Sequence, residues 1–465
     1  MRRSVILGNS GTALEAVTQL GRGMVGYVAA VAASAAIAGL LFGYDTAVIN
    51  GALVYLRAEF RLGSVGTELV ATVLLWGCAV GAALGGYLSD RCGRRAVMLV
   101  AGILFFISAL GAAFSTQLWQ LLAARALDGL AIGSASLVAP LYIAEIAPAR
   151  ERGRLVTFNQ LAIVCGILIA FMGNYELARL SANNWRWMFG LGALPAVALC
   201  ASLLWIPESP RWLLQQGEHE RARKVLQRIS PGAAVETELA DMAKAISEEA
   251  GGYRELLSRS LRKPMVLTIG LAVIQQVTGI NTVLYYGAII FSEHAGTTAG
   301  QAIGMNVLVG VVNLLFTIAA LLLIDRLGRR PLLLMATGGM ALSLMAFAWM
   351  LQWMPGHPAL LLASVLSYVA CFAFGLGSAV WVCLAELFPN RIRGRAMSIA
   401  TVALWLSVSL VTATFLTLIK FLTAPGVFLL YAMLCVASFV YVLLQLPETK
   451  NRTLEEIGSA WSLET

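Results

Sequence analysis

GGYLSDRCGRR (residues 85–95) and LLLIDRLGRR (residues 321–330) are two copies of the motif that decides the fold of this chain of 465 residues. Each copy joins the end of a long apolar run to a group of arginines through an Asp-Arg pair and a glycine. The aspartates, Asp90 and Asp325, lie 235 residues apart, which is about half of the chain. The same motif at this separation indicates that one structural unit occurs twice.

Two further motif pairs recur at nearly the same separation. AEIAPARERGR and AELFPNRIRGR place Glu145 and Glu386 241 residues apart, and PESPR and PETK place Glu208 and Glu448 240 residues apart. The three pairs predict two similar halves joined by the polar segment 209–263. Parallel halves of this kind form transporters that hold a substrate near the bilayer midplane, between halves that rock.

The composition places the chain in a membrane. Hydrophobic residues make up 59% of it and charged residues 12%, whereas a soluble domain carries about a quarter charged residues; the mean hydropathy is +0.79. Apolar runs of about 20 residues, each able to cross a hydrocarbon core of about 30 Å, recur throughout. We expect an all-α membrane protein with twelve transmembrane helices in two six-helix halves. The predicted spans are 24–48, 68–88, 96–115, 118–143, 156–177, 186–206, 265–291, 301–324, 331–354, 359–385, 396–420 and 425–446.

The net charge of +8 follows from where the basic residues lie. Arginine clusters follow the even-numbered spans, and the loops on the other side are nearly free of cations. This positive-inside pattern predicts that both termini are cytoplasmic, and it explains the positive charge without a nucleic-acid partner. The expected organisation is a cytoplasmic N-terminal segment (1–23), a first half (24–206), a cytoplasmic helical linker (207–263), a second half (264–446) and a cytoplasmic tail (447–465).

The linker contains RWLLQQGEHERARKVLQRIS, in which apolar residues recur at near-helical spacing. We therefore expect a small helical bundle here, for most of whose residues the simpler interpretation is a tether without transport chemistry. The apolar positions are Leu213, Ala222, Val225, Leu226 and Ile229.

The motifs together resemble a known family. D-R-x-G-R-R twice, P-E-S-P-R, Q-Q-x-x-G-I-N, A-E-x-x-P-x-x-x-R-G twice and P-E-T are similar to the sugar porter family of the major facilitator superfamily, from about residue 27 to 457. Bacterial proton-coupled pentose and hexose symporters are the most similar members, and the facilitative glucose transporters of animals are more distant ones. The resemblance implies the major facilitator fold and transport, not an enzyme activity.

Paired acids and arginines mark the cytoplasmic ends of spans in both halves. The arginines by themselves satisfy the positive-inside rule. The resemblance implies in addition a latch of ion pairs that forms while the transporter is open outward and breaks when it opens inward. Single surface pairs contribute about 0 to 1 kcal/mol, yet a network can bias states that differ by a few kcal/mol. The predicted latch residues are Asp90, Arg91, Arg94, Glu145, Arg152, Glu208, Asp325, Arg326, Arg329, Glu386, Arg393 and Glu448.

Span 7 carries three carboxamides, Gln275, Gln276 and Asn281, in AVIQQVTGINTVLYY. In an unbroken helix, Gln276 and Asn281 would point about 140° apart. Gly279 between them permits a break, which a membrane tolerates where the backbone lines a cavity. Amides donate and accept hydrogen bonds, as sugar hydroxyls do, so the three are candidate sugar ligands; hydrogen bonding between helices is the alternative.

The resemblance extends the candidate sugar site beyond span 7. It implies that Trp381 stacks on the sugar and that Gly377, one turn earlier, leaves room for it. For Trp405, core packing is the alternative. The predicted substrate-binding residues are Gln160, Gln275, Gln276, Asn281, Asn313, Trp381 and Gly377. The predicted pocket or gate aromatics are Phe42, Tyr285, Tyr286 and Trp405.

The sequence departs from the family pattern at several positions. Leu404 stands where relatives often have Gln or Asn, and Ile167 stands where xylose-type members have a second Gln. A pocket short of two amides makes fewer contacts with hydroxyls, so we expect the affinity or the ring specificity to differ. The prolines usual around 378–380 are also absent, which leaves the kink of span 10 open.

Span 1 contains FGYDTAVING (42–51), and Asp45 is the only charged side chain between Met24 and Leu56. On insertion scales, a charge at the centre of a membrane helix costs roughly 2.5 to 3.5 kcal/mol. GYDTAVI aligns with GINTVLY of span 7, so Asp45 occupies the place that Asn281 holds in the second half. An amide would serve for binding, but a carboxylate can also take up and release a proton.

Arg125 is the only basic residue well inside a predicted span. The resemblance implies a proton-coupling pair of Asp45 and Arg125. From the electrostatics we expect protonation of Asp45 to release Arg125, favour sugar binding and permit rocking. A purely structural buried ion pair is the alternative. Asp128 lies three residues beyond Arg125 on the same helix face. It either holds Arg125 and weakens the pairing with Asp45 or is a second titrating group, and the sequence leaves both open.

The leading hypothesis is a secondary active transporter that imports a monosaccharide (a pentose, a hexose or a related polyol) by proton symport across a bacterial inner membrane. A facilitative uniporter comes second, and a sugar sensor or an exporter ranks lower. The seven cysteines lack paired spacing and the three histidines lie in predicted loops, so neither a metal site nor a cofactor is predicted. The expected partners are the sugar, the proton and the lipid bilayer, and the expected state is a monomer.

Overall fold

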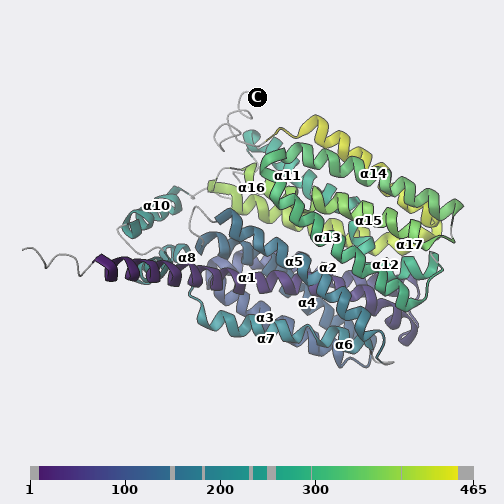
Figure 1. Cartoon of the computed structure of the whole chain (residues 1–465), viewed down its shortest axis with the longest axis horizontal. Coiled ribbons are helices and arrows are strands. Elements are labelled where there is room, and N and C mark those ends of the chain that lie inside the picture. The colour runs from purple at the N-terminus through teal and green to yellow at the C-terminus, as the bar shows by residue number, and fades with distance from the viewer. Residues whose placement is uncertain are drawn as a thin grey trace, which may run out of the picture.

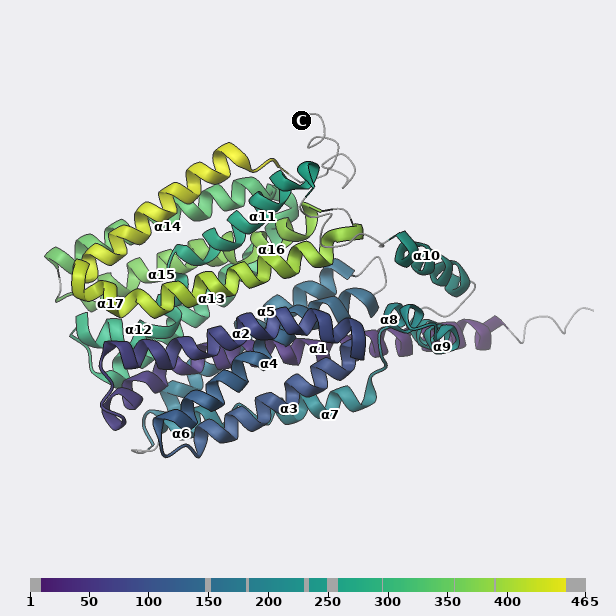
Figure 2. The same ribbon diagram turned by 180° about the vertical axis from the view of Figure 1, so that it is seen from behind.

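The computed structural model describes residues 10–146, 152–180, 184–229, 234–248, 258–294, 296–354, 356–388 and 390–448. These residues form two helical bundles that lie side by side, with a small group of helices beside one end (Figures 1 and 2). The first bundle contains α1 (Ser10–Glu59), α2 (Ser64–Cys92), α3 (Arg94–Ala113), α4 (Leu118–Ile146), α5 (Arg152–Leu177), α6 (Asn184–Gly190) and α7 (Ala193–Trp205). The second contains α11 (Arg259–Val277), α12 (Ile280–His294), α13 (Ala299–Leu327), α14 (Arg329–Trp353), α15 (Pro358–Phe374), α16 (Leu376–Glu386) and α17 (Asn390–Gln445).

The described residues contain eleven helical segments long and apolar enough to cross a membrane. The last of them lies in α17, whose 56 residues would extend about 84 Å as one straight helix, far beyond a hydrocarbon core of about 30 Å. Thr423 (φ 63°) interrupts the helical backbone just before Pro425, so α17 is two helices. The prediction of twelve transmembrane helices in two halves is therefore confirmed.

The first helix extends beyond the predicted span 24–48 at both ends. No proline occurs between Ser10 and Glu59, and α1 is continuous over 50 residues. The part of α1 that projects from the bundle packs against α9 (His219–Ile229), beside α8 (Pro210–Gln215) and α10 (Ala234–Glu248) (Figure 1).

The predicted helical linker is present as α8–α10. The five apolar positions at near-helical spacing are all buried, because α9 packs against both α8 and α10. We call the end of the bundle beside these helices, where α2 ends at Cys92, the linker end. The opposite end, where α2 begins at Ser64, is the far end.

The repeated motif forms the same tight turn between helices in both halves. Gly93 (φ 99°) separates α2 from α3, and Gly328 (φ 93°) separates α13 from α14, a backbone conformation that glycine adopts without strain. The Glu208 carboxylate accepts hydrogen bonds from the backbone N–H groups of Arg94 and Arg95 at 2.9 to 3.2 Å. An acid at a helix N-terminus satisfies free N–H groups and complements the helix dipole.

Glu448 repeats this arrangement in the second half. Its two oxygens accept hydrogen bonds from the backbone N–H groups of Arg329 and Arg330, both at 3.1 Å. The PESPR and PETK motifs thus supply the caps of α3 and α14, and the chain returns from the last span of each half to the turn between the second and third spans of that half.

The halves meet along two equivalent seams. α2 of the first half packs along α17 of the second, and α5 packs along α13. Because α2 corresponds to α13 and α5 to the first part of α17, the two seams repeat one helix pairing. α1 and α12 also meet across the interface.

Three spans are broken within the described residues. α6 and α7 are separated at Leu191 and Gly192, α11 and α12 at Thr278 and Gly279, and α15 and α16 at Gly375. At Gly375 a Cβ atom would lie 2.5 Å from the Leu332 carbonyl oxygen. The close approach of α14 to this glycine accompanies the break in span 10, although the usual prolines are absent.

The first half depends on a close approach of α2 and α4. A Cβ atom at Gly129 would lie 2.0 Å from the Leu74 carbonyl oxygen, and one at Gly133 would lie 2.1 Å from that of Cys78. Small residues at membrane helix interfaces permit such contact, and here they bring the Arg125 region of α4 against α2.

We expect Gly129→Ala to lower the midpoint of thermal unfolding of the purified protein in detergent by several degrees, because α2 and α4 would have to separate. Gly173→Ala on α5 is the matched control, since a Cβ atom there meets nothing within 4 Å; a helix gains up to about 1 kcal/mol from this change. Equal midpoints for the two variants would contradict the close contact.

Candidate functional site

The three carboxamides of span 7 form a hydrogen-bonded chain. The Asn281 amide nitrogen donates to the Gln276 side-chain oxygen at 2.5 Å, and the Gln276 nitrogen donates to the Gln275 oxygen at 3.1 Å. The predicted break makes this possible, because Gly279 has φ 88° and separates α11 from α12. The turn thus joins side chains that an unbroken helix would point apart.

The chain of amides is anchored to the broken span 10. The Gln275 nitrogen donates to the Leu376 carbonyl oxygen at 2.8 Å, which places the amides beside the start of α16, next to Gly377. Trp381 is half-buried one turn later on α16. At Gly377 a Cβ atom would lie 3.2 Å from the Phe372 ring, so the room expected beside this glycine is bounded by Phe372.

The other predicted ligands lie on the opposing seam of the halves. Gln160 is half-buried on α5 and Asn313 is buried on α13, and these two helices pack together. Among the described residues, no hydrogen bond joins Gln160 or Asn313 to the amides of span 7. A ligand that contacts all of the predicted residues would therefore have to bridge both halves.

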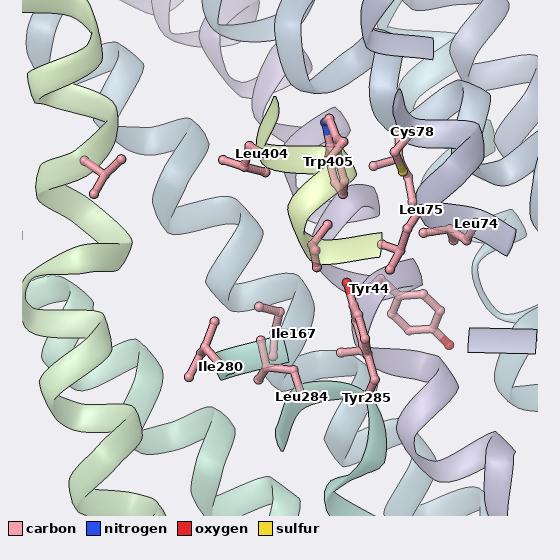
Figure 3. Close-up of a cluster of buried hydrophobic side chains, with 14 of the residues drawn as sticks. Tyr44, Leu74, Leu75, Cys78, Ile167, Ile280, Leu284, Tyr285, Leu404 and Trp405 are labelled. Carbon is pink, nitrogen blue, oxygen red and sulfur yellow. The ribbon is translucent and has the colours of Figure 1, made fainter. Parts of the chain in front are cut away.

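The predicted aromatics divide into two groups. The Phe42 and Trp405 rings lie 5.5 Å apart and join α1 to α17 across the interface, and Tyr285 of α12 lies in the same buried cluster (Figure 3). Tyr286 instead donates its hydroxyl to the Thr412 carbonyl oxygen at 2.8 Å and stacks on Phe415. Tyr286 therefore packs α12 against α17.

The two positions that depart from the family pattern are apolar and lie close to these aromatics. Leu404 and Ile167 are buried in one cluster with Tyr285 and Trp405 (Figure 3). Trp405 Nε1 is buried and has no hydrogen-bond partner among the described residues. The wall between the halves is thus apolar at these two positions.

The acid of span 1 lies beside the arginine of span 4 without an ion pair between them. Asp45 and Arg125 are 5% and 1% exposed. Arg125 Nη1 donates to the Asp45 backbone carbonyl oxygen at 3.3 Å and to Asp128 Oδ2 at 3.1 Å. The second oxygen of Asp128 accepts a hydrogen bond from the Ser108 hydroxyl at 3.0 Å. In this conformation the ion pair of Arg125 is thus with Asp128.

The remaining surroundings of this cluster are aromatic and uncharged. The Phe189 ring lies over the Arg125 guanidinium at 5.4 Å. Asp45 Oδ1 faces the backbone of Gly192, and the Tyr44 hydroxyl donates to the Met188 carbonyl oxygen at 2.6 Å. The broken span 6 therefore closes the site at one side.

The predicted latch residues form one constellation in each half. The Arg94 guanidinium pairs with Glu145 at 3.0 Å and with Asp90 at 3.1 Å. Arg329 repeats this with Glu386 at 2.8 Å and Asp325 at 3.0 Å. Arg91 bonds the Tyr87 hydroxyl, and Arg326 is exposed. These pairs join helices within a half, while the Arg152 and Arg393 side chains lie outside the described residues.

Sequence reasoning missed a buried acid that joins the halves at the far end. Glu68, near the start of α2, is 4% exposed. Its oxygens accept hydrogen bonds from the Thr417 backbone N–H at 2.6 Å and the Thr417 hydroxyl at 2.7 Å. The only signal in the sequence was an acid at the first position of the predicted span 68–88.

Asn50 makes a second contact across the interface that was missed. Its side-chain nitrogen donates to the carbonyl oxygens of Val283 and Leu284, and its oxygen accepts from the Ala288 N–H. Arg57 and Glu293 form a half-exposed ion pair at 2.5 Å nearby. The contacts of Glu68, Asn50 and Arg57 all lie between Asp45 and the far end, so the two halves touch there.

We expect Glu68→Ala to loosen the far end, because Thr417 would lose both hydrogen bonds to the carboxylate, and hydrogen bonds to charged groups contribute about 1.5–3 kcal/mol each. Spin labels at Val65 and Phe421, both exposed, report the separation of α2 and α17 in a background without native cysteines. Glu68→Ala should shift the distance distribution to longer values.

The matched control is Glu293→Ala, which removes only a half-exposed ion pair worth about 0 to 1 kcal/mol. It should leave the distance distribution nearly unchanged. An unchanged distribution in Glu68→Ala as well would show that this acid does not hold the halves together.

Comparison with known proteins agrees with this geometry. The family model described as "Sugar (and other) transporter" matches residues 31–461. The D-xylose-proton symporter of Escherichia coli K12 is 36% identical, over 94% of this chain and 96% of its own length. The arabinose-proton symporter of Bacillus subtilis is 35% identical over 94% and 96%. A partially occluded inward-open structure of the E. coli xylose transporter XylE superposes with a TM-score of 0.82 at 33% identity, covering 92% of this chain and all of that one.

Proposed function

Because the chain belongs to the sugar transporter family matched by that model, we propose that it imports a monosaccharide together with a proton by alternating access. The substrate class is a pentose, a hexose or a related polyol. The main observation in support of proton coupling is the buried Asp45, which lies beside Arg125. Asp45 occupies the position in the first half that Asn281 occupies in the second. One repeat unit thus supplies an acid and the other an amide.

The sugar is bound mainly by the second half. The chain from Gln275 to Asn281 offers amide donors and acceptors beside Leu376 and Gly377, and Trp381 supplies an apolar face for stacking. Gln160 and Asn313 complete the site from the seam of α5 and α13. The apolar positions Leu404 and Ile167 favour a sugar with few hydroxyls on that side, or looser recognition of the ring.

The proton is exchanged at Asp45. An ionised carboxylate inside the hydrocarbon region is costly. The free energy of a given packing of the first half therefore changes when Asp45 takes up or releases a proton. Coupling requires that the proton and the sugar both favour the same conformation. Phe42 and Trp405 meet across the interface, and Tyr285 belongs to the same buried cluster as Trp405 (Figure 3). These aromatics form the gate that opens or closes with the protonation of Asp45.

The charged constellations at the linker end make each half move as a unit. Arg94 ties together the ends of α2, α3 and α4, and Arg329 ties together those of α13, α14 and α16. The latch between the halves involves Arg152 and Arg393. Far-end contacts through Glu68 and Asn50 close the opposite side in this conformation.

The protein is a multi-pass membrane protein. We place it in a bacterial inner membrane, since the relatives reported above are bacterial, and the positive-inside rule supports an orientation with the arginine-rich linker end and both termini in the cytoplasm. With this orientation the far end faces outward, and the described conformation is closed to the outside. The functional unit is a monomer, since one chain supplies both halves of the site.

The first test is the external pH of a lightly buffered, de-energised suspension of expressing cells, to which each sugar of a pentose, hexose and polyol panel is added. One sugar should produce a transient alkalinisation, because the proton enters with it. Asp45→Asn should abolish the signal, and sugars that are not transported serve as controls. Entry of labelled sugar without a pH change, equal in Asp45→Asn and the unaltered protein, would identify a uniporter.

A further inference from the structure

Asp128 occupies the place at Arg125 that an ionised Asp45 was expected to fill. Asp128 Oδ2 lies 3.1 Å from Arg125 Nη1, whereas Asp45 offers the arginine only its backbone carbonyl oxygen, at 3.3 Å. We infer that Asp128 is the resident counter-ion of Arg125 and leaves the Asp45 carboxylate free to carry the coupled proton. This inference rests on the proposed symport and adds a positioning residue to it.

Asp128 is held from two helices. Both of its oxygens have partners, Arg125 on its own helix and the Ser108 hydroxyl of α3 at 3.0 Å. Hydrogen bonds to a carboxylate favour its ionised form. No described residue donates a hydrogen bond to the Asp45 carboxylate. The two acids beside one arginine therefore have different roles, one fixed and one free.

No second cation faces the cluster among the described residues. The groups that face it from the neighbouring helices are Tyr44 on α1, Cys78 on α2, Ser108 on α3, Phe189 on α6 and Tyr285 on α12. Hydroxyl, phenol and thiol groups are uncharged near neutral pH. The charge of the cluster is thus set by two carboxylates and one guanidinium.

This charge count requires one proton for neutrality. With both acids ionised the cluster carries one net negative charge, which is costly at a buried site within the membrane. One proton on Asp45 leaves a neutral Arg125–Asp128 pair. Protonation of the Asp45 carboxylate therefore does not have to break an ion pair with Arg125, because Arg125 is already paired with Asp128.

Arg125 retains a donor that could serve Asp45. Its Nε is buried and has no partner among the described residues. If the charge of Asp128 were removed, the guanidinium would be free to pair with the Asp45 carboxylate. Asp45 would then lose a nearby negative charge and gain a positive partner, and both changes oppose its protonation.

The test uses the purified full-length protein and the sugar identified by the alkalinisation assay, with sugar affinity measured by calorimetry as a function of pH. Asp128→Asn should move the pH midpoint of binding to lower pH by about one unit or more. Asp128→Glu keeps the charge and should restore a midpoint close to that of the unaltered protein. Asp45→Asn should remove the pH dependence.

Two results would overturn the inference. One is an unchanged pH midpoint in Asp128→Asn. The other is proton uptake on sugar binding that persists in Asp45→Asn, since Asp128 would then carry the proton.

A second measurement tests the ion pair without sugar. In a double-mutant cycle on thermal unfolding, Arg125→Gln and Asp128→Asn should be non-additive, and more strongly so than Arg125→Gln and Asp45→Asn. Stronger coupling to Asp45 would overturn the assignment of Asp128. Absence of alkalinisation by the unaltered protein would instead overturn the proposed symport, while the cycle still decides which acid is the partner of Arg125.

Discussion

Hydrocarbon offers no water to an exposed polar group, so a polar side chain in this bundle is stabilised by a partner within the protein. The buried arginine of α4 finds an acid one turn away and a backbone carbonyl of α1. The amides of span 7 find one another because the helix breaks at Gly279. Glu68 accepts hydrogen bonds from the backbone N–H and the hydroxyl of Thr417 on the opposite half. The same constraint thus makes the site and fixes where the halves touch.

The two halves share one repeated arrangement of helices, and the positions at which they differ give the site its functional groups. Glu208 and Glu448 cap equivalent helices after equivalent glycine turns, and the seams of the two halves repeat one helix pairing. Two copies of a binding unit would by themselves yield a symmetric site. The acid at position 45, opposite an amide in the second half, breaks the symmetry and gives one half a group that can exchange a proton.

The sequence was sufficient to predict the twelve spans, the two halves and the helical linker, and to show that Gly279 permits a break in span 7, because these depend on hydropathy, spacing and local backbone preference. It could not predict which acid is the partner of Arg125. That choice depends on how α3 and α4 are rotated relative to α1, and three residues of spacing allow either partner. The contact of Glu68 with Thr417 was equally inaccessible, since it joins positions 349 residues apart. The roles assigned to the sugar ligands and the latch remain predictions.

The most direct test of proton coupling is sugar accumulation against a gradient in proteoliposomes, with the membrane potential clamped at zero and the interior one pH unit more alkaline. One pH unit is worth about 1.4 kcal/mol per proton, so symport of one proton per sugar predicts that the transported sugar accumulates about tenfold inside. Asp45→Asn should bring the sugar only to equal concentrations. Equal concentrations with the unaltered protein, reached at a measurable rate, would contradict proton coupling and leave Asp45 a structural residue.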